Sequence, residues 1–358
     1  MPKPLSSCFD KKFRVGVKTR QIFKVGLVGF AHGHAHHILE LLNESNLGTL
    51  VAAAIEDKPV LKSRKEIVQK ESNLKRIYSD YQEMLDKEDI DVVFNYTDNV
   101  MRASVTELAA SKGLHVMLEK PMAYNLEDAD RMLKAAESNK VKLMVNWPTM
   151  WSPAYRKAYQ LINEGAIGDV FHIRTRTGHD MPQKETFAQS VDFQWMGTKE
   201  GGGAYMDFCC YGAALTVWLM GMPKQVFGTA GNFVKSFLPG YDNGILVMMY
   251  DKGTATIEGT WSTIGGIPGG PMIFGSKGTI LLGREITLFT KEHPEGKTVE
   301  LDPLPEGERN AVEYFLTCVK EDKPIGGMCN PKLSRDVQEV LEAGIVSSEN
   351  KKVVTLGT

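Results

Sequence analysis

Four of the chain's eight histidines lie within the segment FAHGHAHH, residues 30–37. Histidine is the commonest metal ligand, and His32 and His36, four apart, would share one helical face, so a metal site is one interpretation. The flanks favour another, because an apolar valine-rich stretch precedes the segment and apolar residues of helical spacing follow it. A strand, a tight turn and a helix form a phosphate-binding loop, since the first helical turn has unpaired N–H groups. With no HExxH pattern and no nearby cysteine, we expect no metal here.

The same loop departs from the glycine pattern G-x-G-x-x-G of dinucleotide-binding folds. It reads GFAHGH at residues 29–34, so only the first glycine is in place. Ala31 is tolerable if its φ stays negative, whereas His34 is bulky for a helix–sheet packing position. Glu56 supports a cofactor, because a carboxylate at the end of the second strand accepts hydrogen bonds from both ribose hydroxyls of NAD. Lys58 and further basic residues follow, so NADP stays open.

A second group of chemically competent residues lies in HVMLEKPMAYNLEDADRM, residues 115–132. Here a strand ends in Glu119-Lys120-Pro121, at the edge where an open α/β sheet presents residues to a ligand. Partial desolvation lowers the pKa of a lysine at such an edge and lets it bind or deprotonate a hydroxyl group. By itself, a Lys-Pro pair after a strand is usually only a turn.

An acid and a phenol lie together in GGGAYMDFCCYGAALTVWLMG, residues 201–221. Asp207 and Tyr211 are four apart, so both are expected to project from one helical face. An aspartate in so apolar a helix needs a partner, for which Lys120 is the candidate. That cation would also favour the tyrosinate and draw its pKa from about 10 toward neutral pH. The alternative is a core tyrosine and a carboxylate that interacts with the helix dipole.

Alternating strand-like and helix-like segments position these residues from residue 22 to residue 146. The expected strands are 24–29, 49–55, a short one at 76–79, 91–96, 115–119 and 142–146, and the expected helices between them are 33–44, 59–71, 81–86, 101–112 and 126–138. Apolar strands separated in this way predict a parallel sheet with both faces covered. The sequence therefore predicts an N-terminal, doubly wound Rossmann domain at 22–146.

After Trp147 the pattern changes to strands with alternating polarity. The expected strands are 170–177, 225–233, 244–250, 254–261 and 278–289, and the expected helices are 153–164, 203–220 and 332–347. The DKG turn after Tyr250 predicts a hairpin, so much of this sheet should be antiparallel. The predicted fold class is α/β, with the Rossmann domain followed at 147–358 by an α+β domain for substrate binding and oligomerisation that has a large, mostly antiparallel open sheet. Residues 1–21 are expected to form a polar N-terminal extension.

Composition excludes several classes of protein. The 358 residues suggest about two domains, and 42 basic against 44 acidic residues lack the surplus that nucleic-acid binding needs. Five cysteines without a CxxC pattern make a disulfide framework improbable. No apolar run approaches the roughly 18 residues that span a bilayer. We therefore expect a cytoplasmic protein with neither a nucleic-acid nor a membrane partner.

From about residue 22 to residue 356 the chain resembles the Gfo/Idh/MocA family of sugar and polyol oxidoreductases. Glu119-Lys120-Pro121 is similar to the family's EKP motif at the end of the fifth strand. Thr97-Asp98-Asn99 resembles its TPN turn, with Asp98 in place of proline and Arg102 where a histidine is frequent. The glycines at 201–203, with Asp207 and Tyr211, resemble its GGGxxxDxxxH/Y helix, and FGSKGTILL at 274–282 its late strand pair.

The resemblance implies NAD as the cofactor, with NADP not excluded, and Lys120, Asp207 and Tyr211 as catalytic residues beside the nicotinamide. A tyrosine at the last position is similar to the branch of glucose–fructose oxidoreductase, dihydrodiol dehydrogenase and xylose dehydrogenase. The residues expected to bind the cofactor are Gly29, Phe30, Ala31, His32, His34, Glu56, Thr97, Asn99, Glu119 and Lys120. The residues expected to bind substrate are Lys120, Trp147, His179, Asp207 and Tyr211, with Asp180, Trp151 and Trp195 as further candidates.

We therefore expect reversible hydride transfer between the carbinol carbon of a sugar, polyol or related hydroxyl compound and C4 of a nicotinamide. Tyr211 would take the hydroxyl proton, Lys120 would hold the hydroxyl oxygen and polarise the phenol, and Asp207 would orient Lys120. Two alternatives stay open: an NAD-assisted lyase or glycosidase, and a non-catalytic NAD(H)-binding sensor, which the incomplete glycine pattern suggests. Substrate choice would depend on loops such as 179–200 and 232–243.

Two further expectations concern assembly and the histidines. Helices are expected on only part of one face of the second sheet, so a homodimer or homotetramer should form through that sheet. In the loop, the backbone N–H groups of Phe30, Ala31 and His32 are expected to face phosphates, and His34 to reach the nicotinamide or a phosphate oxygen. Imidazoles that face an anion gain charge as pH falls, so cofactor affinity should rise from about pH 8 to 6. A metal site predicts the opposite sign.

Overall fold

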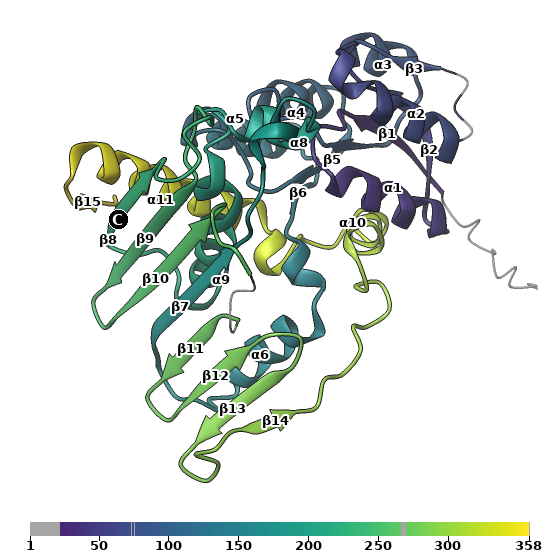
Figure 1. Ribbon diagram of the computed structural model, residues 1–358. Coiled ribbons are helices and arrows are strands. Elements are labelled where there is room, and N and C mark those ends of the chain that lie inside the picture. Colours follow the sequence, from purple (N-terminus) through teal and green to yellow (C-terminus); the bar gives the residue numbers. More distant parts are fainter. Residues whose placement is uncertain (1–21, 73, 75, 266–269, 358) are drawn as a thin grey trace, which may run out of the picture.

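The computed structural model describes residues 22–357 except 73, 75 and 266–269; the expected extension at 1–21 lies outside this range. Its first sheet has six strands in the order β3-β2-β1-β4-β5-β6, and every neighbouring pair is parallel (Figure 1). The strands are β1 (Phe23–Val28), β2 (Gly48–Ala54), β3 (Ile77–Tyr78), β4 (Val92–Asn95), β5 (His115–Glu119) and β6 (Leu143–Asn146). This is the doubly wound Rossmann order that the alternating pattern predicted.

Five helices connect these strands: α1 (His34–Glu44), α2 (Lys62–Glu71), α3 (Tyr81–Lys87), α4 (Arg102–Ser111) and α5 (Leu126–Ser138). The strand order reverses between β1 and β4, whose ends meet where Val28 pairs with Asn95. The loops after these two strands, together with the loop after β5, therefore open into one crevice, where such sheets bind their ligands.

The second sheet has nine strands in the order β14-β13-β12-β11-β7-β10-β9-β8-β15 (Figure 1). Its strands are β7 (Val170–Gly178), β8 (Gln225–Gly231), β9 (Asn243–Tyr250), β10 (Gly253–Thr260), β11 (Met272–Gly275), β12 (Gly278–Leu282), β13 (Ile286–Thr290), β14 (Lys297–Val299) and β15 (Val354–Thr355). All pairs are antiparallel except β7 with β10. The expected mostly antiparallel sheet is confirmed.

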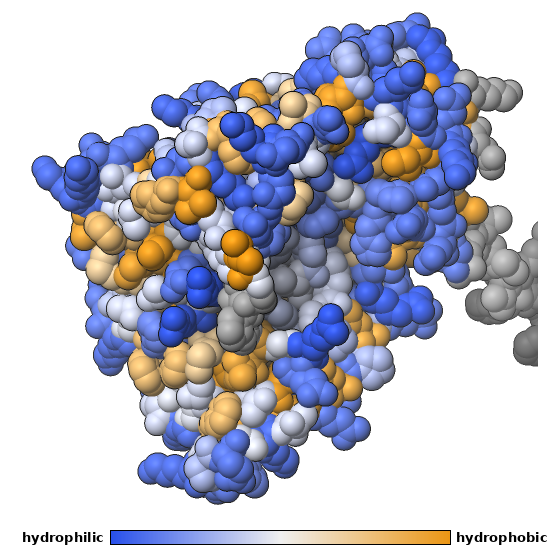
Figure 2. Space-filling model, in the orientation of Figure 1, coloured by the Kyte–Doolittle hydropathy of each residue, from blue (hydrophilic) through white to orange (hydrophobic). Residues whose placement is uncertain are grey.

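Helices cover one face of this sheet. They are α6 (Pro153–Asn163), α9 (Cys210–Met220) and α11 (Pro331–Asn350), and α11 also packs against α5 of the first domain. The opposite face carries apolar side chains at alternating, cross-paired positions, including Phe227, Ile245, Val247, Met249, Met272 and Phe274. Phe227 and Ile245 are 40% and 42% exposed. Figure 2 shows hydrophobic residues scattered among polar ones on the visible surface of this domain.

Several elements were not expected from the sequence. The stretch 278–289 contains two strands, β12 and β13, because a turn at residues 283–285 interrupts it. Helix α10 (Ala311–Lys320) packs against α1 of the Rossmann domain, and two short helices, α7 (Lys184–Phe187) and α8 (Val191–Met196), follow β7. Helices of one or two turns carry little periodic signal. No helix within the described ranges is long and apolar enough to span a membrane.

Candidate active site

Lys120 lies at the centre of the crevice, directly after β5, and is only 2% exposed. Its Nζ donates hydrogen bonds to Oδ1 of Asp207 at 2.8 Å and to the Asp207 carbonyl at 3.3 Å. The indole N–H of Trp261 donates to the other carboxylate oxygen of Asp207 at 3.1 Å. The structure thus brings together the lysine and aspartate that the sequence paired, and it adds Trp261 as a second donor.

Asp207 belongs to a π-helical turn (Tyr205–Cys209) that leads into α9. Such turns contain one extra residue and are frequent at functional sites. The turn follows Gly203, which has a φ of +56° and whose added Cβ would lie 1.9 Å from the Tyr241 carbonyl oxygen. Only glycine fits this position. The triple glycine therefore allows the close chain approach that directs Asp207 toward Lys120.

Tyr211 lies on the other side of Lys120, whose Nζ is 4.5 Å from the centroid of the phenol ring. This is a cation–π contact. Burial raises the pKa of Tyr211 above its ordinary value, although Lys120 acts to lower it. The expected shift toward neutral pH is therefore wrong. The physical reason is that phenolate desolvation outweighs the attraction of an ammonium whose charge Asp207 already balances.

The expected lowering of the Lys120 pKa is also wrong. Burial does disfavour the ammonium, but Asp207, first among several nearby acidic groups that include Glu119, helps to outweigh that penalty, and together these groups hold the pKa of Lys120 well above its ordinary value. Lys120 is therefore a permanent cation and hydrogen-bond donor at neutral pH. It does not act as a base.

Glu119, the last residue of β5, contacts the histidines of the loop before α1. It is fully buried, and its Oε1 is 2.9 Å from Nδ1 of His34. Burial alone would raise the pKa of Glu119, but His34 and the nearby His32 and Lys120 lower it to about 2. An ionised carboxylate only accepts hydrogen bonds, so Nδ1 of His34 carries a proton. One ring nitrogen of His34 thus contacts Glu119 within the protein, and its contact with a phosphate or with the nicotinamide stays a prediction.

His32 completes this cluster. Its Nδ1 accepts the backbone N–H of His34 at 3.1 Å, and burial lowers its pKa well below the ordinary value. His32 is therefore a neutral imidazole whose proton is on Nε2. The two histidines and Glu119 lie within metal-binding distance of one another. In this arrangement Nδ1 of His32 and Nδ1 of His34 are already engaged in hydrogen bonds within the protein, and the expectation that no metal binds here stays a prediction.

The loop before α1 only partly offers the amides expected for phosphates. Gly29 has a φ of +78°, and an added Cβ would lie 2.7 Å from the backbone of Thr97, so only glycine permits this approach. The N–H of Ala31 donates to the Tyr96 carbonyl at 3.0 Å, which corrects its assignment to phosphate. Phe30 and His32 have no such backbone bond within the described residues.

The turn at 97–99 packs against the EKP segment through Arg102, which the sequence did not assign to the site. The fully buried guanidinium donates to the carbonyl of Thr97 at 2.9 Å and to the carbonyl of Pro121. Burial lowers the pKa of Arg102 to about 10, so it stays charged. Arg102 therefore fixes the loop after β4 against the loop after β5. A lone arginine in a helix start gives no sequence signal for this role.

A cavity of about 30 Å³ lies beside the loop at residues 29–34, which we call the fingerprint loop. Its lining includes Gly29, Phe30, Ala31, Glu56 and Thr97. Glu56 is at the end of β2, as expected for a ribose-binding carboxylate, and forms an ion pair with Lys58 at 2.5 Å. A smaller cavity of about 10 Å³ lies between the domains, lined by His32, Asn99, Lys120, Trp195 and Asp207. Most of the predicted cofactor residues, together with Lys120 and Asp207, therefore line two cavities, whereas His34, Glu119 and Tyr211 are not part of either lining.

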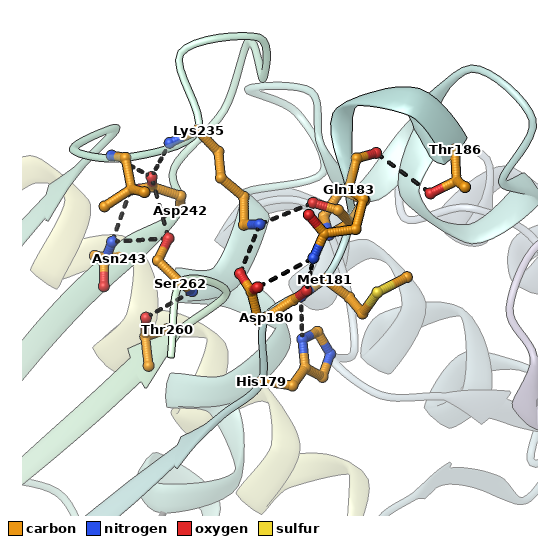
Figure 3. A network of polar contacts seen from close by, with 12 residues as sticks. His179, Asp180, Met181, Gln183, Thr186, Lys235, Asp242, Asn243, Thr260 and Ser262 are labelled. Atoms are coloured by element: carbon orange, nitrogen blue, oxygen red, sulfur yellow. Dashed lines mark hydrogen bonds and ion pairs between the residues drawn. The ribbon is translucent and has the colours of Figure 1, made fainter. Parts of the chain in front are cut away.

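His179 directly follows β7 in the second domain. Its Nδ1 accepts the N–H of Met181 at 3.1 Å (Figure 3). Its ring lies 4.9 Å, centroid to centroid, from the ring of Phe208. Burial lowers its pKa, so it is a neutral donor through Nε2. The adjacent Asp180 binds Nζ of Lys235 at 2.9 Å, which ties the segment after β7 to the loop 232–243.

The three tryptophans that the sequence indicated as candidates for substrate binding differ in position. Trp147 has no exposed surface, donates its indole N–H to Ser334 and packs edge-on against Tyr211. Its expected contact with substrate is therefore wrong, because a fully enclosed ring has no free face for a sugar. Trp151 donates to Asn146 and is likewise structural. Trp195 lines the cavity beside Lys120.

Both domains of the chain match known protein families. Residues 23–147 match the oxidoreductase family with an NAD-binding Rossmann fold, and residues 155–281 match the GFO/IDH/MocA C-terminal domain. The chain belongs to the Gfo/Idh/MocA family of oxidoreductases. Its first domain is an NAD-binding Rossmann domain, and the expected family and cofactor class are confirmed.

Three relatives illustrate the similarity. The chain is 26% identical over 230 residues to trans-1,2-dihydrobenzene-1,2-diol dehydrogenase of Xenopus laevis, which covers 64% of this chain and 67% of that protein. It is 25% identical over 213 residues to D-xylose 1-dehydrogenase (NADP(+)) 2 of Haloferax volcanii, covering 59% and 62%. The structure of an inositol dehydrogenase homologue from Azotobacter vinelandii, complexed with NADH and myo-inositol, superimposes with a TM-score of 0.78 at 19% identity, covering 94% and 98%.

The residues of the crevice fit a nicotinamide dinucleotide. Gly29 leaves the space that close approach of a phosphate requires. Oδ1 of Asn99 and Oε2 of Glu119 are buried and, within the described ranges, have no hydrogen-bond partner. Buried polar atoms of this kind call for a donor, which a bound ligand can supply. Lys120, at the same strand end, adds a cation beside them.

Proposed function

We propose that this protein transfers a hydride between a carbinol carbon of a sugar, polyol or related hydroxyl compound and a nicotinamide cofactor. The observation that carries the proposal is Lys120, held between the Asp207 carboxylate and the Tyr211 ring at the carboxyl end of β5. When bound, the nicotinamide supplies the site that gives or accepts the hydride. The protein's own residues must then hold the substrate oxygen and move one proton.

Lys120 is the residue that holds the substrate oxygen. Its ammonium is charged, nearly enclosed and fixed by two hydrogen bonds to Asp207. A preorganised cation in so dry a place stabilises the negative charge that grows on the oxygen as its proton leaves. Asp207 is a positioning residue, because it acts on the substrate through Lys120. Nε2 of His179 supports the site as a neutral donor to a further hydroxyl group.

Tyr211 is our candidate for the proton transfer. Because burial raises its pKa, the phenol is protonated at neutral pH and is ready to donate a proton to a carbonyl oxygen. The reverse direction requires the same oxygen to accept a proton, which becomes easier as pH rises. We therefore infer that the site favours carbonyl reduction near neutral pH and alcohol oxidation at alkaline pH.

Glu56 supports NAD over NADP as the preferred cofactor. Its carboxylate lies at the end of β2 beside the dinucleotide cavity and would repel a 2′-phosphate. Lys58 compensates part of that charge from 2.5 Å away. Glu56→Ser should therefore raise the ratio of NADP to NAD affinity, and Lys58→Gln should lower it. Binding titrations with both reduced cofactors measure the two ratios.

We also propose that two or four copies assemble through the uncovered face of the second sheet. The exposed Phe227 and Ile245 and their apolar neighbours form a surface that water solvates poorly. A twofold arrangement would bury this face against its copy. Light scattering at micromolar concentration tests the idea, since a mass of 39.7 kDa would contradict it.

The test of function is incubation with either oxidised cofactor and a panel of sugars and polyols, while the absorbance of the reduced cofactor is followed. Net formation of reduced cofactor supports the dehydrogenase. Product without net reduced cofactor would instead indicate an NAD-assisted lyase, and neither signal with tight NADH binding would indicate a sensor. Lys120→Met is the matched inactive control, and Lys157→Met, on the outer surface of α6, is the control for lysine replacement itself.

A further inference from the structure

The segment at residues 179–200, which contains α7 and α8, crosses from the second domain onto the fingerprint loop of the first domain. The indole N–H of Trp195 donates to the Ala31 carbonyl at 3.0 Å. One turn earlier in α8, Oδ1 of Asp192 accepts a hydrogen bond from the guanidinium of Arg64 at 3.2 Å. Arg64 belongs to α2, and its Cζ lies 5.7 Å from the ring centroid of Phe30. Two residues of α8 thus contact the loop that begins the dinucleotide site.

The carboxylate of Asp192 occupies an anion-binding position. An added Cβ on Gly33 would lie 3.2 Å from Oδ2 of Asp192, so the carboxylate lies against the loop backbone just before α1. Burial raises the pKa of Asp192 above its ordinary value, although Arg64, the backbone of Gly33 and the ring of His34 act to lower it. All three of these groups favour a negative charge. They surround Asp192 at the point where a Rossmann loop binds phosphate.

The space beside these residues is small. The cavities at the fingerprint loop and beside Lys120 are about 30 Å³ and about 10 Å³, whereas pockets for cofactors and drug-sized ligands are usually of order 300–1,000 Å³. An open groove of about 760 Å³ separates α2 from the neighbouring part of the segment, and its lining includes Lys58, Lys62, Gln189 and Gln194. The segment therefore touches this side of the first domain mainly through Arg64 and the fingerprint loop.

The start of the segment is fixed separately. Nζ of Lys235, itself 6% exposed, binds Oδ1 of Asp180 and the Pro182 carbonyl, both at 2.9 Å (Figure 3). Asp242 in turn accepts the backbone N–H groups of residues 233–235. The segment is thus anchored to the second domain at residues 180–182. Its contacts with the first domain lie beyond that anchor, in α8.

We propose that Arg64 is a phosphate-binding residue of the cofactor site and that Asp192 is an internal anion that competes with the cofactor's phosphates for it. The inference rests on the proposed nucleotide binding at the same loop. As pyrophosphate binds beside the Gly33 backbone, Arg64 exchanges the Asp192 carboxylate for phosphate oxygens. Asp192 and α8 then move away while Lys235 retains Asp180. Cofactor affinity is therefore lower than the loop alone would give, by the free energy of breaking the Asp192 contacts.

The experiment compares ADP, which carries the phosphates, with adenosine, which does not. Asp192→Asn keeps the shape of the side chain but removes its charge, so we expect ADP and NADH to bind about five- to tenfold more tightly, with adenosine unchanged. The gain should shrink at high salt because the competition is between charges. Glu185→Gln, an exposed change on α7, is the matched control and should leave both affinities unchanged.

Arg64 variants test the shared partner. Arg64→Gln should weaken ADP binding about tenfold, and Asp192→Asn should bring no gain in that background. Calorimetry gives these affinities without reference to turnover, and Trp195 fluorescence reports whether α8 leaves Ala31. Equal changes for ADP and adenosine in Asp192→Asn, or no change, would overturn this inference alone. A wild-type protein that binds neither NADH nor ADP would overturn the proposed function as well.

Discussion

The ammonium nitrogen of Lys120 lies 2.8 Å from the carboxylate of Asp207, although 87 positions separate the two residues in the chain. One residue ends a strand of the Rossmann sheet, and the other begins the helix that covers the second sheet. The pair therefore forms only when both domains are folded and docked. It links the Rossmann domain to the second domain across the crevice.

Removal of the cation should abolish turnover without loss of cofactor binding. Lys120→Met is expected to lower kcat by at least about a hundredfold, because the substrate oxygen loses its fixed positive partner. NADH affinity, measured by fluorescence titration, should change much less. Turnover close to wild type in this variant would show that another residue stabilises the oxygen.

Breaking the buried pair from the acid side should cost stability. Asp207→Ala leaves Lys120 charged and enclosed, so the free energy of unfolding should fall by about 3–5 kcal/mol. The double variant Lys120→Met with Asp207→Leu should be more stable than Asp207→Ala alone, because neither charge remains. Urea unfolding compares them. Because the pKa of Lys120 is raised, its contribution is complete below its unfolded pKa of about 10.5 and should not vary between pH 6 and 9.

The pH profile of oxidation should follow Tyr211. With its pKa raised, the rate of alcohol oxidation should rise with pH through the neutral and mildly alkaline range, whereas carbonyl reduction should not. Tyr211→Phe should lower both rates about a hundredfold or more and remove this rise. A wild-type oxidation rate that is flat from pH 6 to 9 would argue against the phenol as proton acceptor.

Stability should fall in mild acid because of His32. The pKa of His32 is lowered in the folded state. Below about pH 6.5 His32 is therefore protonated in the unfolded state but not in the folded state, so stability is lost as pH falls. His32→Asn should reduce this slope by up to about 1.4 kcal/mol per pH unit. His115 and His179 are shifted in the same direction, so part of the slope should remain. The same substitution at exposed His37 is the control, and urea midpoints at pH 7 and 5.5 measure the difference.

Cofactor binding should not depend on a metal ion. Because Nδ1 of His32 and Nδ1 of His34 are engaged in hydrogen bonds within the protein, we expect NADH affinity to be the same with and without a chelator. The affinity rise toward acid that the sequence suggested should be absent at His32, which stays neutral. An affinity that collapses on chelation would restore the metal interpretation of the histidine cluster.

The sequence by itself determined the fold class and identified most of the residues that we propose for the catalytic centre. Apolar strands at regular intervals require helices on both faces of a parallel sheet, and that order places strand ends such as Glu119-Lys120 at the crevice. The spacing of Asp207 and Tyr211 behind three glycines was likewise readable, because local chain geometry fixes which residues share a helical face.

Only the tertiary structure decided the electrostatics and the contacts between domains. Whether Lys120 gains or loses a proton depends on the balance between burial and Asp207, and neither can be read from the lysine's own neighbours in the chain. The same holds for the raised pKa of Tyr211, for the enclosed Trp147 and for Arg102, which joins two loops. Asp192 reaches Arg64 across 128 positions through a helix too short to leave a periodic pattern. The protonation state of a charged group and the accessibility of an aromatic ring depend on the residues that pack around them in space. The spacing of residues along the chain does not encode these tertiary contacts.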